Sequence, residues 1–400
     1  MKYRKLMTCI CIASMGFTAC GKGELPSFQQ AEVPTASITK ALEEAMPDAP
    51  MQEWMEGRCE EIAAVYRPLY EALDGMTPSQ SDIDAMEEVL IREGLDVIDT
   101  NEIYPSYLVT PDHVHSFWNA VQNQQQAQQE VILITASGAL AYRLFTYDGI
   151  GGFLYSMTYP LDGDRERSYE VNSIKDWELT EKDNFFYRIL PANDKHYPDF
   201  SLIRLNPADH ELYDMTLHYI FPVSYVAANV FLVDWTEGDW KNLCFNDQFE
   251  YLYLTRLGKQ FNADEYPMLK DQYGYAIPAE EFEAVVMPYY NIDLNTFREL
   301  SQYNSDGNYY PWRPLETNDF AFIWYYNIEP QVTAYRKNAD GTLTLTVEAL
   351  SSDLKMDCLF AHEITVRPLE NGAFQYVGNR VTYQTEYGLP CTIPRRMWNF

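Results

Sequence analysis

Hydrophobic residues recur at helical spacing in the first part of the chain that follows a polar, proline-containing stretch. Apolar side chains three or four positions apart predict an amphipathic helix within residues 51–75 and a second one over 83–90, which Gly94 ends. Residues 114–130 predict a third helix. The folded part of the chain is therefore expected to begin with a helical pair and one further helix.

Beyond residue 130 the apolar positions alternate with polar ones, which is typical of strands. Alternation over 141–147 and 153–159, with Asp148 and Gly149 between them, predicts a hairpin. Two further hairpins are expected near the C-terminus, at 331–347 and 363–377. Strands are also predicted at 130–135, 184–190 and 199–205, and helices at 206–221, 246–258, 278–283 and 293–302. The predicted fold class is α+β, with an N-terminal helical segment, a mixed middle region and a C-terminal antiparallel sheet with hairpins.

The first nineteen residues have the pattern of a secretory signal peptide. Lys2, Arg4 and Lys5 form a basic start without acidic residues, and an apolar run follows over residues 6–17. As a helix this run would span about 18 Å, too short for a bilayer core of about 30 Å. Residues 1–19 are therefore expected to be removed.

Residues 17–21 read Phe-Thr-Ala-Cys-Gly and resemble the lipobox of bacterial lipoproteins, although Phe17 stands where leucine is usual. The resemblance implies that Cys20 becomes the first residue of the mature chain and carries a thioether-linked diacylglyceryl group. Two acyl chains suffice for stable anchoring. The membrane is thus expected to be a partner through Cys20, at its extracytoplasmic face.

The rest of the chain divides into three regions by composition. Residues 20–50 contain four prolines among polar residues and predict a flexible tether. Residues 51–257 are expected to form a helical plus α+β region. Residues 258–400 are expected to begin with a helix and continue as an antiparallel β-rich region.

The charge balance restricts the classes of partner. The chain has 59 acidic and 29 basic residues, and removing the three basic residues of the signal would change its net charge from -30 to -33. Such a chain is repelled by phosphate, which excludes sequence-independent nucleic-acid binding and a charge-driven grip on anionic lipid. Its 46% hydrophobic composition is typical of a folded protein.

The cysteines suggest no metal site. Cys59, Cys244, Cys358 and Cys391 remain after the signal, and three pairings among them stay open, with Cys358–Cys391 preferred if a disulfide forms. They lie far apart without a Cys-x-x-Cys motif, which argues against a zinc ribbon.

No motif of a hydrolase, metalloprotease or phosphate-binding loop is present. His113 and His115 could share a metal on a strand, but they stand at the start of a predicted helix, where side chains two positions apart diverge. The Asp- and Gly-containing stretches at 162–164 and 338–341 match turns better than calcium loops. No metal and no cofactor are therefore expected.

Two aromatic runs are the candidate ligand-binding residues. Trp235 and Trp240 flank Glu237 and Asp239, so two indoles could stack on a sugar while the carboxylates accept its hydroxyl hydrogen bonds. The alternative is a turn whose indoles fill the core. A second run places Tyr309, Tyr310 and Trp312 together, either as an interface or as core.

Several aromatic stretches carry a family resemblance, at residues 221–225, 229–235, 245–250 and 277–283. They resemble a family of Gram-positive lipoproteins known only as a domain of unknown function, from about residue 50 onward. The resemblance supplies no catalytic residues. We expect a non-enzymatic binding or accessory protein for a cell-wall glycan, peptide or protein partner. The alternatives are a surface hydrolase acting on carbohydrate or peptidoglycan through Glu237 or Asp239, and an accessory subunit of a membrane complex.

Overall fold

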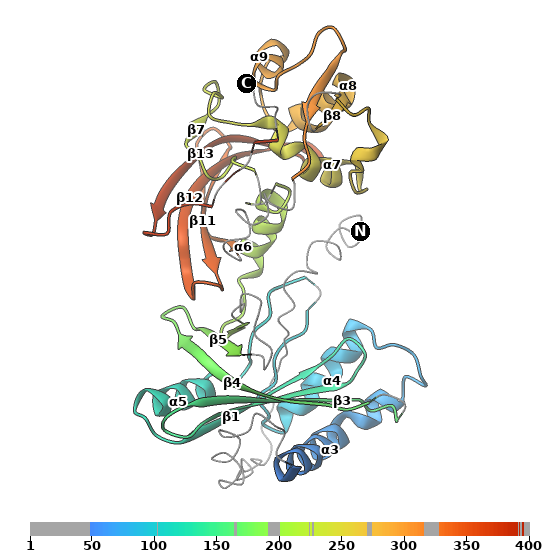
Figure 1. Cartoon of the computed structure of the whole chain (residues 1–400), viewed down its shortest axis with the longest axis vertical. Helices are drawn as coiled ribbons and strands as arrows, with labels where there is room; N and C mark the ends of the chain where they lie inside the picture. Colours follow the sequence, from blue (N-terminus) through green and yellow to red (C-terminus); the bar gives the residue numbers. More distant parts are fainter. Residues whose placement is uncertain are drawn as a thin grey trace. The chain divides into compact units, whose positions relative to one another are not determined.

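The computed structural model describes residues 49–101, 103–163, 166–190, 201–223, 225, 228–269, 274–315, 328–390, 392, 394 and 395 (Figure 1). The chain divides between Ala208 and Asp209 into an N-terminal and a C-terminal unit. The expected boundary at residue 257 falls inside the second unit, at the end of a helix. Helices come first and antiparallel hairpins last, which confirms the predicted α+β class.

The N-terminal unit begins with the predicted helices, α3 (Ala49–Glu71), α4 (Gln80–Arg92) and α5 (Pro111–Gln122). Helix α4 starts at a capping box, in which the Ser79 amide donates to Asp82 at 2.8 Å. Helix α5 ends earlier than the predicted residue 130. Gln124 there adopts a left-handed φ of 54°, and the Gln125 amide bonds back to the Ala120 carbonyl. The prediction was wrong at this end because a strand begins within four residues.

Six strands follow as an antiparallel meander in which each pairs with the next along the chain. They are β1 (Ala127–Ile134), β2 (Leu140–Tyr147), β3 (Gly152–Tyr159), β4 (Ser168–Leu179), β5 (Asn184–Leu190) and β6 (Ser201–Arg204). The predicted hairpin around Asp148 and Gly149 is confirmed as β2 and β3.

The two edge strands of this meander are joined through segments that precede it. Val97 forms a bridge with Ile132 of β1, Ile98 with Leu108, and Tyr107 with Arg204 of β6. The Leu108 amide donates to the Arg204 carbonyl at 2.7 Å. The six strands and these two segments therefore close into a ring of backbone hydrogen bonds, which gives the sheet an inner face.

Helices cover the sheet on both faces. Tyr142, Tyr155 and Met157 point from one face and are buried together with side chains of α3 and α4. On the other face, Phe117 and Trp118 of α5 make edge contacts with the ring of Trp177. Gly152 permits this packing, since a Cβ there would lie 2.5 Å from the Trp177 ring.

The C-terminal unit starts with α6 (His210–Met215), continued by the π-helix Thr216–Ile220. Its other helices are α7 (Phe249–Leu257), α8 (Ala279–Val286) and α9 (Leu294–Leu300), with short 3-10 turns at Phe245–Gln248, Ala263–Glu265, Met287–Tyr289 and Glu370–Gly372. Strands β8 (Tyr275–Pro278) and β9 (Tyr309–Trp312) pair with each other.

The second sheet has the order β10-β11-β12-β13-β7. Its strands are β7 (Trp235–Thr236), β10 (Ile328–Lys337), β11 (Leu343–Ser351), β12 (Met356–Pro368) and β13 (Phe374–Gln384). Both hairpins expected near the C-terminus are present, because β10 pairs with β11 and β12 with β13. Among the described residues, no helix combines the length and hydropathy needed to cross a bilayer.

Candidate functional site

The inner face of the six-stranded sheet carries a pocket of about 440 Å³. It is lined by residues of all six strands, from Leu133 of β1 to Ser201 of β6, so this face is concave. The volume lies in the range of small-ligand sites, and the interior of a curved sheet is a common place for them. The pocket is therefore the candidate site.

The floor of the pocket is apolar and fixed by packing. Leu133, Leu154 and Tyr187 all line it, and each is almost fully buried. The ring of Tyr187 makes an edge contact with Phe145 at 5.0 Å between centroids. Phe145 contacts Phe185 in turn, so the floor continues into the aromatic cluster beneath α5.

Polar groups stand in a row across the middle of the pocket. Strand register places Arg143 of β2 beside Ser156 of β3, and Ser156 beside Glu170 of β4. Thr158 and Asn172 line the pocket next to this row. An apolar floor with a few convergent polar groups is the usual composition of a binding site.

The two charged groups of this row lack an oppositely charged partner among the described residues. The Arg143 guanidinium is half-buried and donates one hydrogen bond, from Nη1 to the Tyr187 hydroxyl at 3.1 Å. Glu170 is exposed at the rim. The described part of the chain thus leaves both charges available to a ligand.

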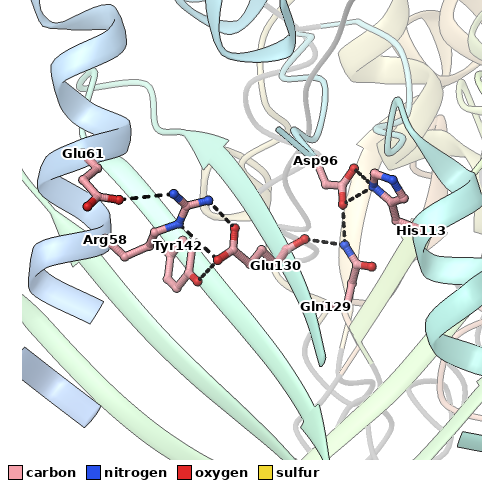
Figure 2. Close-up of polar contacts among 7 residues, drawn as sticks. All are labelled: Arg58, Glu61, Asp96, His113, Gln129, Glu130 and Tyr142. Atoms are coloured by element: carbon pink, nitrogen blue, oxygen red, sulfur yellow. Dashed lines mark hydrogen bonds and ion pairs between the residues drawn. The ribbon is translucent and has the colours of Figure 1, made fainter. Parts of the chain in front are cut away.

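A chain of polar contacts runs from α3 through strand β1 to α5 (Figure 2). Arg58 of α3 donates to Glu130 from Nε at 3.1 Å and from Nη2 at 2.8 Å, and the Tyr142 hydroxyl donates to Glu130 at 2.9 Å. The two charged side chains are 4% and 7% exposed. Because an ion pair this deep requires every partner, we assign it a structural role.

The preceding residue of β1, Gln129, points to the opposite face and continues the series of polar contacts (Figure 2). The Gln129 amide donates to Asp96 at 2.6 Å, and His113 Nδ1 lies 2.8 Å from the same carboxylate. Thr110 also donates to Asp96. The hydrogen bond to Asp96 raises the pKa of His113, which stands on the first turn of α5. His113 therefore keeps its proton to a higher pH than a free imidazole does.

Glu87 on α4 is a further buried acid. Its side chain is almost completely buried, and it accepts a hydrogen bond from the Thr100 hydroxyl at 2.6 Å. Burial raises the pKa of Glu87 to about 9. The carboxyl group is therefore neutral at physiological pH, which suits a packing role.

The structure places the indoles of the first aromatic run inside the C-terminal unit. Trp235 and Trp240 are buried, with ring centroids 5.5 Å apart, and Trp235 Nε1 donates to the Val230 carbonyl at 2.8 Å. They correspond to the turn whose indoles fill the core. Gly238 with φ of 92° makes that turn.

The carboxylates of the same run are paired with other side chains. Arg367 Nη2 lies 2.6 Å from Glu237, and Asn291 donates to the same carboxylate. Partial burial raises the pKa of Glu237, but the bonds from Arg367 and Asn291 outweigh this effect and hold the pKa below its usual value. Asp239 lies 3.0 Å from Lys241. The acids are therefore occupied, and the geometry does not favour a ligand between the indoles.

The second aromatic run also lies mainly in the core. Tyr310 and Trp312 are buried, whereas Tyr309 is half-buried. The Tyr310 hydroxyl donates to Glu283 at 2.8 Å, and the Arg395 guanidinium lies 5.0 Å from the Trp312 ring centre. These residues join β9 to α8 and do not meet the first run in a shared pocket.

Cys20 and Cys391 lie outside the described residues, so the anchor and the preferred disulfide stay predictions. His115 lies 3.4 Å from Asp183, whereas His113 contacts Asp96, so the two histidines diverge as expected at the start of a helix. Within the described part of the chain, no three His, Cys, Asp or Glu side chains are arranged to hold a metal ion. Asp340 accepts hydrogen bonds from Thr342 in a turn.

Sequence reasoning missed the pocket residues. A signal was present, because Arg143 interrupts an apolar alternation at a position that shares a face with Phe145. One arginine in a strand does not identify a pocket without the pairing of the other strands.

Comparison with known proteins supplies a family but no activity. No curated protein and no solved structure shows significant similarity to the chain. The model of a family of unknown function, DUF6070, matches residues 52–395. This match spans both structural units, and the chain therefore belongs to the DUF6070 family.

Proposed function

We propose that this chain is a lipid-anchored extracytoplasmic binding protein whose ligand occupies the pocket of the N-terminal unit. The ligand is a cell-wall component, a glycan or a peptide, or a segment of a partner protein. The observation that carries the proposal is the pocket itself, with its buried apolar floor and a row of polar groups that includes two charges without an oppositely charged partner among the described residues.

The anchor supports the location of the proposed activity. Cys20 follows a segment with the features of a signal peptide, and about thirty polar and proline-containing residues separate it from α3. A tether of this composition lets a folded unit reach beyond the membrane surface. The acidic chain is repelled by anionic lipid, so the acyl chains and not the charge would hold it there.

The pocket is favoured over the aromatic run at 235–240 as the place where a ligand binds. The hydrolase alternative relied on Glu237 and Asp239, which make ion pairs with Arg367 and Lys241. The pocket residues Arg143 and Glu170 make none among the described residues. Binding through them therefore requires no existing ion pair to break.

Ligand-induced thermal stabilisation tests the proposal. The chain from residue 21 onward would be screened with wall fragments, sugars and short peptides, and a ligand at a hundredfold over its dissociation constant stabilises by about 2.7 kcal/mol. Ser156→Trp fills the pocket and should abolish the shift. Ser173→Trp is the matched control, because Ser173 is exposed on the other face of β4. A shift that survives Ser156→Trp would contradict the pocket as the site.

Membrane fractionation tests the anchor separately. Cys20→Ala should move the full chain from the membrane to the soluble fraction, or leave it unprocessed. Cys9→Ala, a substitution within the expected signal, should change nothing. Unchanged membrane association of Cys20→Ala together with unchanged processing would overturn the lipoprotein proposal without bearing on the pocket.

A further inference from the structure

We infer that the pocket takes a short peptide with free ends, whose carboxylate binds Arg143 and whose ammonium group binds Glu170. This inference rests on the proposed function and specifies its ligand. The pair of opposite charges in one pocket carries it, together with the row of hydrogen-bonding groups between them.

Arg143 is suited to one end of such a ligand. A guanidinium has five N–H donors in a planar fork that matches a carboxylate. One donor of Arg143 is used by the Tyr187 hydroxyl, which orients the group above the pocket floor. The remaining donors can form a two-point contact with a terminal carboxylate.

Glu170 is suited to the other end. Its carboxylate stands at the exposed rim, two strands away from Arg143 on the same face. An ammonium group donates three hydrogen bonds, which the Glu170 carboxylate and the Asn172 side-chain oxygen can accept. The half-buried hydroxyls of Ser156 and Thr158 lie between the two ends and can pair with a peptide group.

The spacing of the two charges sets the length of the ligand. Neighbouring strands lie about 4.8 Å apart, so the backbones at Arg143 and Glu170 are separated by roughly 10 Å. An extended chain spans about 3.3–3.6 Å per residue. A dipeptide or tripeptide therefore fits between the side chains.

Ligands of other classes complement the charged groups of the pocket less well. A neutral sugar would leave the half-buried guanidinium without a counter-charge, which is unfavourable. An anionic polymer would meet Arg143 but would be repelled by Glu170 and by the net charge of -30. Only a ligand with both charges complements both groups.

The test compares three tripeptide libraries of equal composition, with both ends free, with an acetylated N-terminus, or with an amidated C-terminus. Each is incubated with the complete mature chain, and the retained peptides are measured by ultrafiltration and mass spectrometry. We expect retention of free-ended peptides and a loss of at least tenfold with either cap, since each cap removes one charge.

Two variants test which side chain recognises which end of the peptide. Arg143→Gln should weaken the binding of free-ended peptides. Amidation of the C-terminus should then no longer change retention, whereas acetylation of the N-terminus should still reduce it. Glu170→Gln should give the opposite pattern. Arg67→Gln on α3 and Glu181→Gln in the turn between β4 and β5 are matched controls, outside the pocket, and should behave as the unchanged chain.

The outcomes separate this inference from the proposed function. Equal retention of capped and free peptides, or variants that keep both sensitivities, would overturn the inference. If wall glycans bind, no peptide binds, and Ser156→Trp abolishes the glycan binding, the inference is overturned, but the pocket remains the ligand site of the proposed function. No pocket-dependent binding of any probe would overturn both.

Discussion

The two sheets of this chain treat polar groups differently. In the six-stranded sheet, charged side chains stand on both faces, with Glu130 in a buried ion pair and Arg143 in the pocket. In the five-stranded sheet, His362 and Asn379 are two of the buried polar groups. His362 Nε2 lies 2.8 Å from the Tyr225 hydroxyl, and its Nδ1 lies 2.7 Å from Asn379.

The histidine of the second sheet is neutral. Burial lowers the pKa of His362 to about 4, whereas Asp96 raises the pKa of His113 in the N-terminal unit. Asn379 also donates to the Phe231 and Val233 carbonyls and so ties a loop to the sheet. The second sheet therefore uses neutral polar groups for assembly, while the first keeps charges within reach of a ligand.

The largest expected effect comes from breaking the buried ion pair. Glu130→Gln leaves the Arg58 guanidinium without its counter-charge inside the unit, so we expect a loss of about 3–5 kcal/mol in the free energy of unfolding. Glu363→Gln is the control, because Glu363 pairs with the mostly exposed Arg380 and should change stability by less than about 1 kcal/mol. Hydrogen exchange read separately for each unit checks both. Equal losses of unfolding free energy in Glu130→Gln and Glu363→Gln would contradict the difference drawn between the two sheets.

Acid should destabilise the C-terminal unit through His362. The pKa of His362 in the folded state lies below its unfolded value of about 6.5, so its contribution is complete above that pH. The contribution is lost as the pH falls towards 4, by about 3 kcal/mol in total. Urea unfolding at pH 7 and pH 4.5, followed by hydrogen exchange, measures this slope. His362→Gln should flatten it, and an unchanged slope would rule out His362 as the cause.

The N-terminal unit should respond in the opposite direction through Glu87. Burial raises the pKa of Glu87 to about 9, so its contribution is present below its unfolded value of about 4.3 and is lost as the pH rises towards 9. Glu87→Gln keeps the neutral form and should stabilise this unit by about 3 kcal/mol at pH 7. Glu88→Gln, in an exposed pair with Arg92, is the adjacent control. A destabilised Glu87→Gln at pH 8 would refute this reasoning.

The smallest effect is expected at His113. The hydrogen bond to Asp96 raises the pKa of His113, so protonation stabilises helix α5 below about pH 6.5 and this contribution is lost as the pH rises through the folded pKa. His113→Gln should reduce the pH dependence of amide exchange in α5 between pH 6 and 8. His115→Gln, two residues further on, should leave it intact. If His115→Gln reduced the pH dependence of amide exchange and His113→Gln did not, His113 would be ruled out as its source.

Local patterns predicted the elements better than the site. The hairpin at residues 141–159 and the C-terminal hairpins follow from alternation and turn residues, which act over short distances. The end of α5 was missed because Gln124 adopts a left-handed conformation that its residue type does not require. Trp235 and Trp240 have the same sequence signature whether buried or exposed, so only packing decides between core and surface.

The pocket could not be predicted because it depends on pairings between distant segments. Arg143 and Glu170 become neighbours of one cavity only when three strands align in register. Asp96 reaches Gln129 and His113 only after a segment ahead of the meander joins β1. Neither arrangement leaves a repeat or motif in the sequence.

The ring closure also has a consequence for the order of folding. Strands β1 to β6 pair with their neighbours in sequence, whereas the bridge between Tyr107 and Arg204 joins the two ends of a long intervening segment. Closing such a loop carries a larger entropic penalty than forming a hairpin, so we expect the meander to assemble first and the seam last. The pocket then acquires its final shape only in the last step, after most of the unit has become stable.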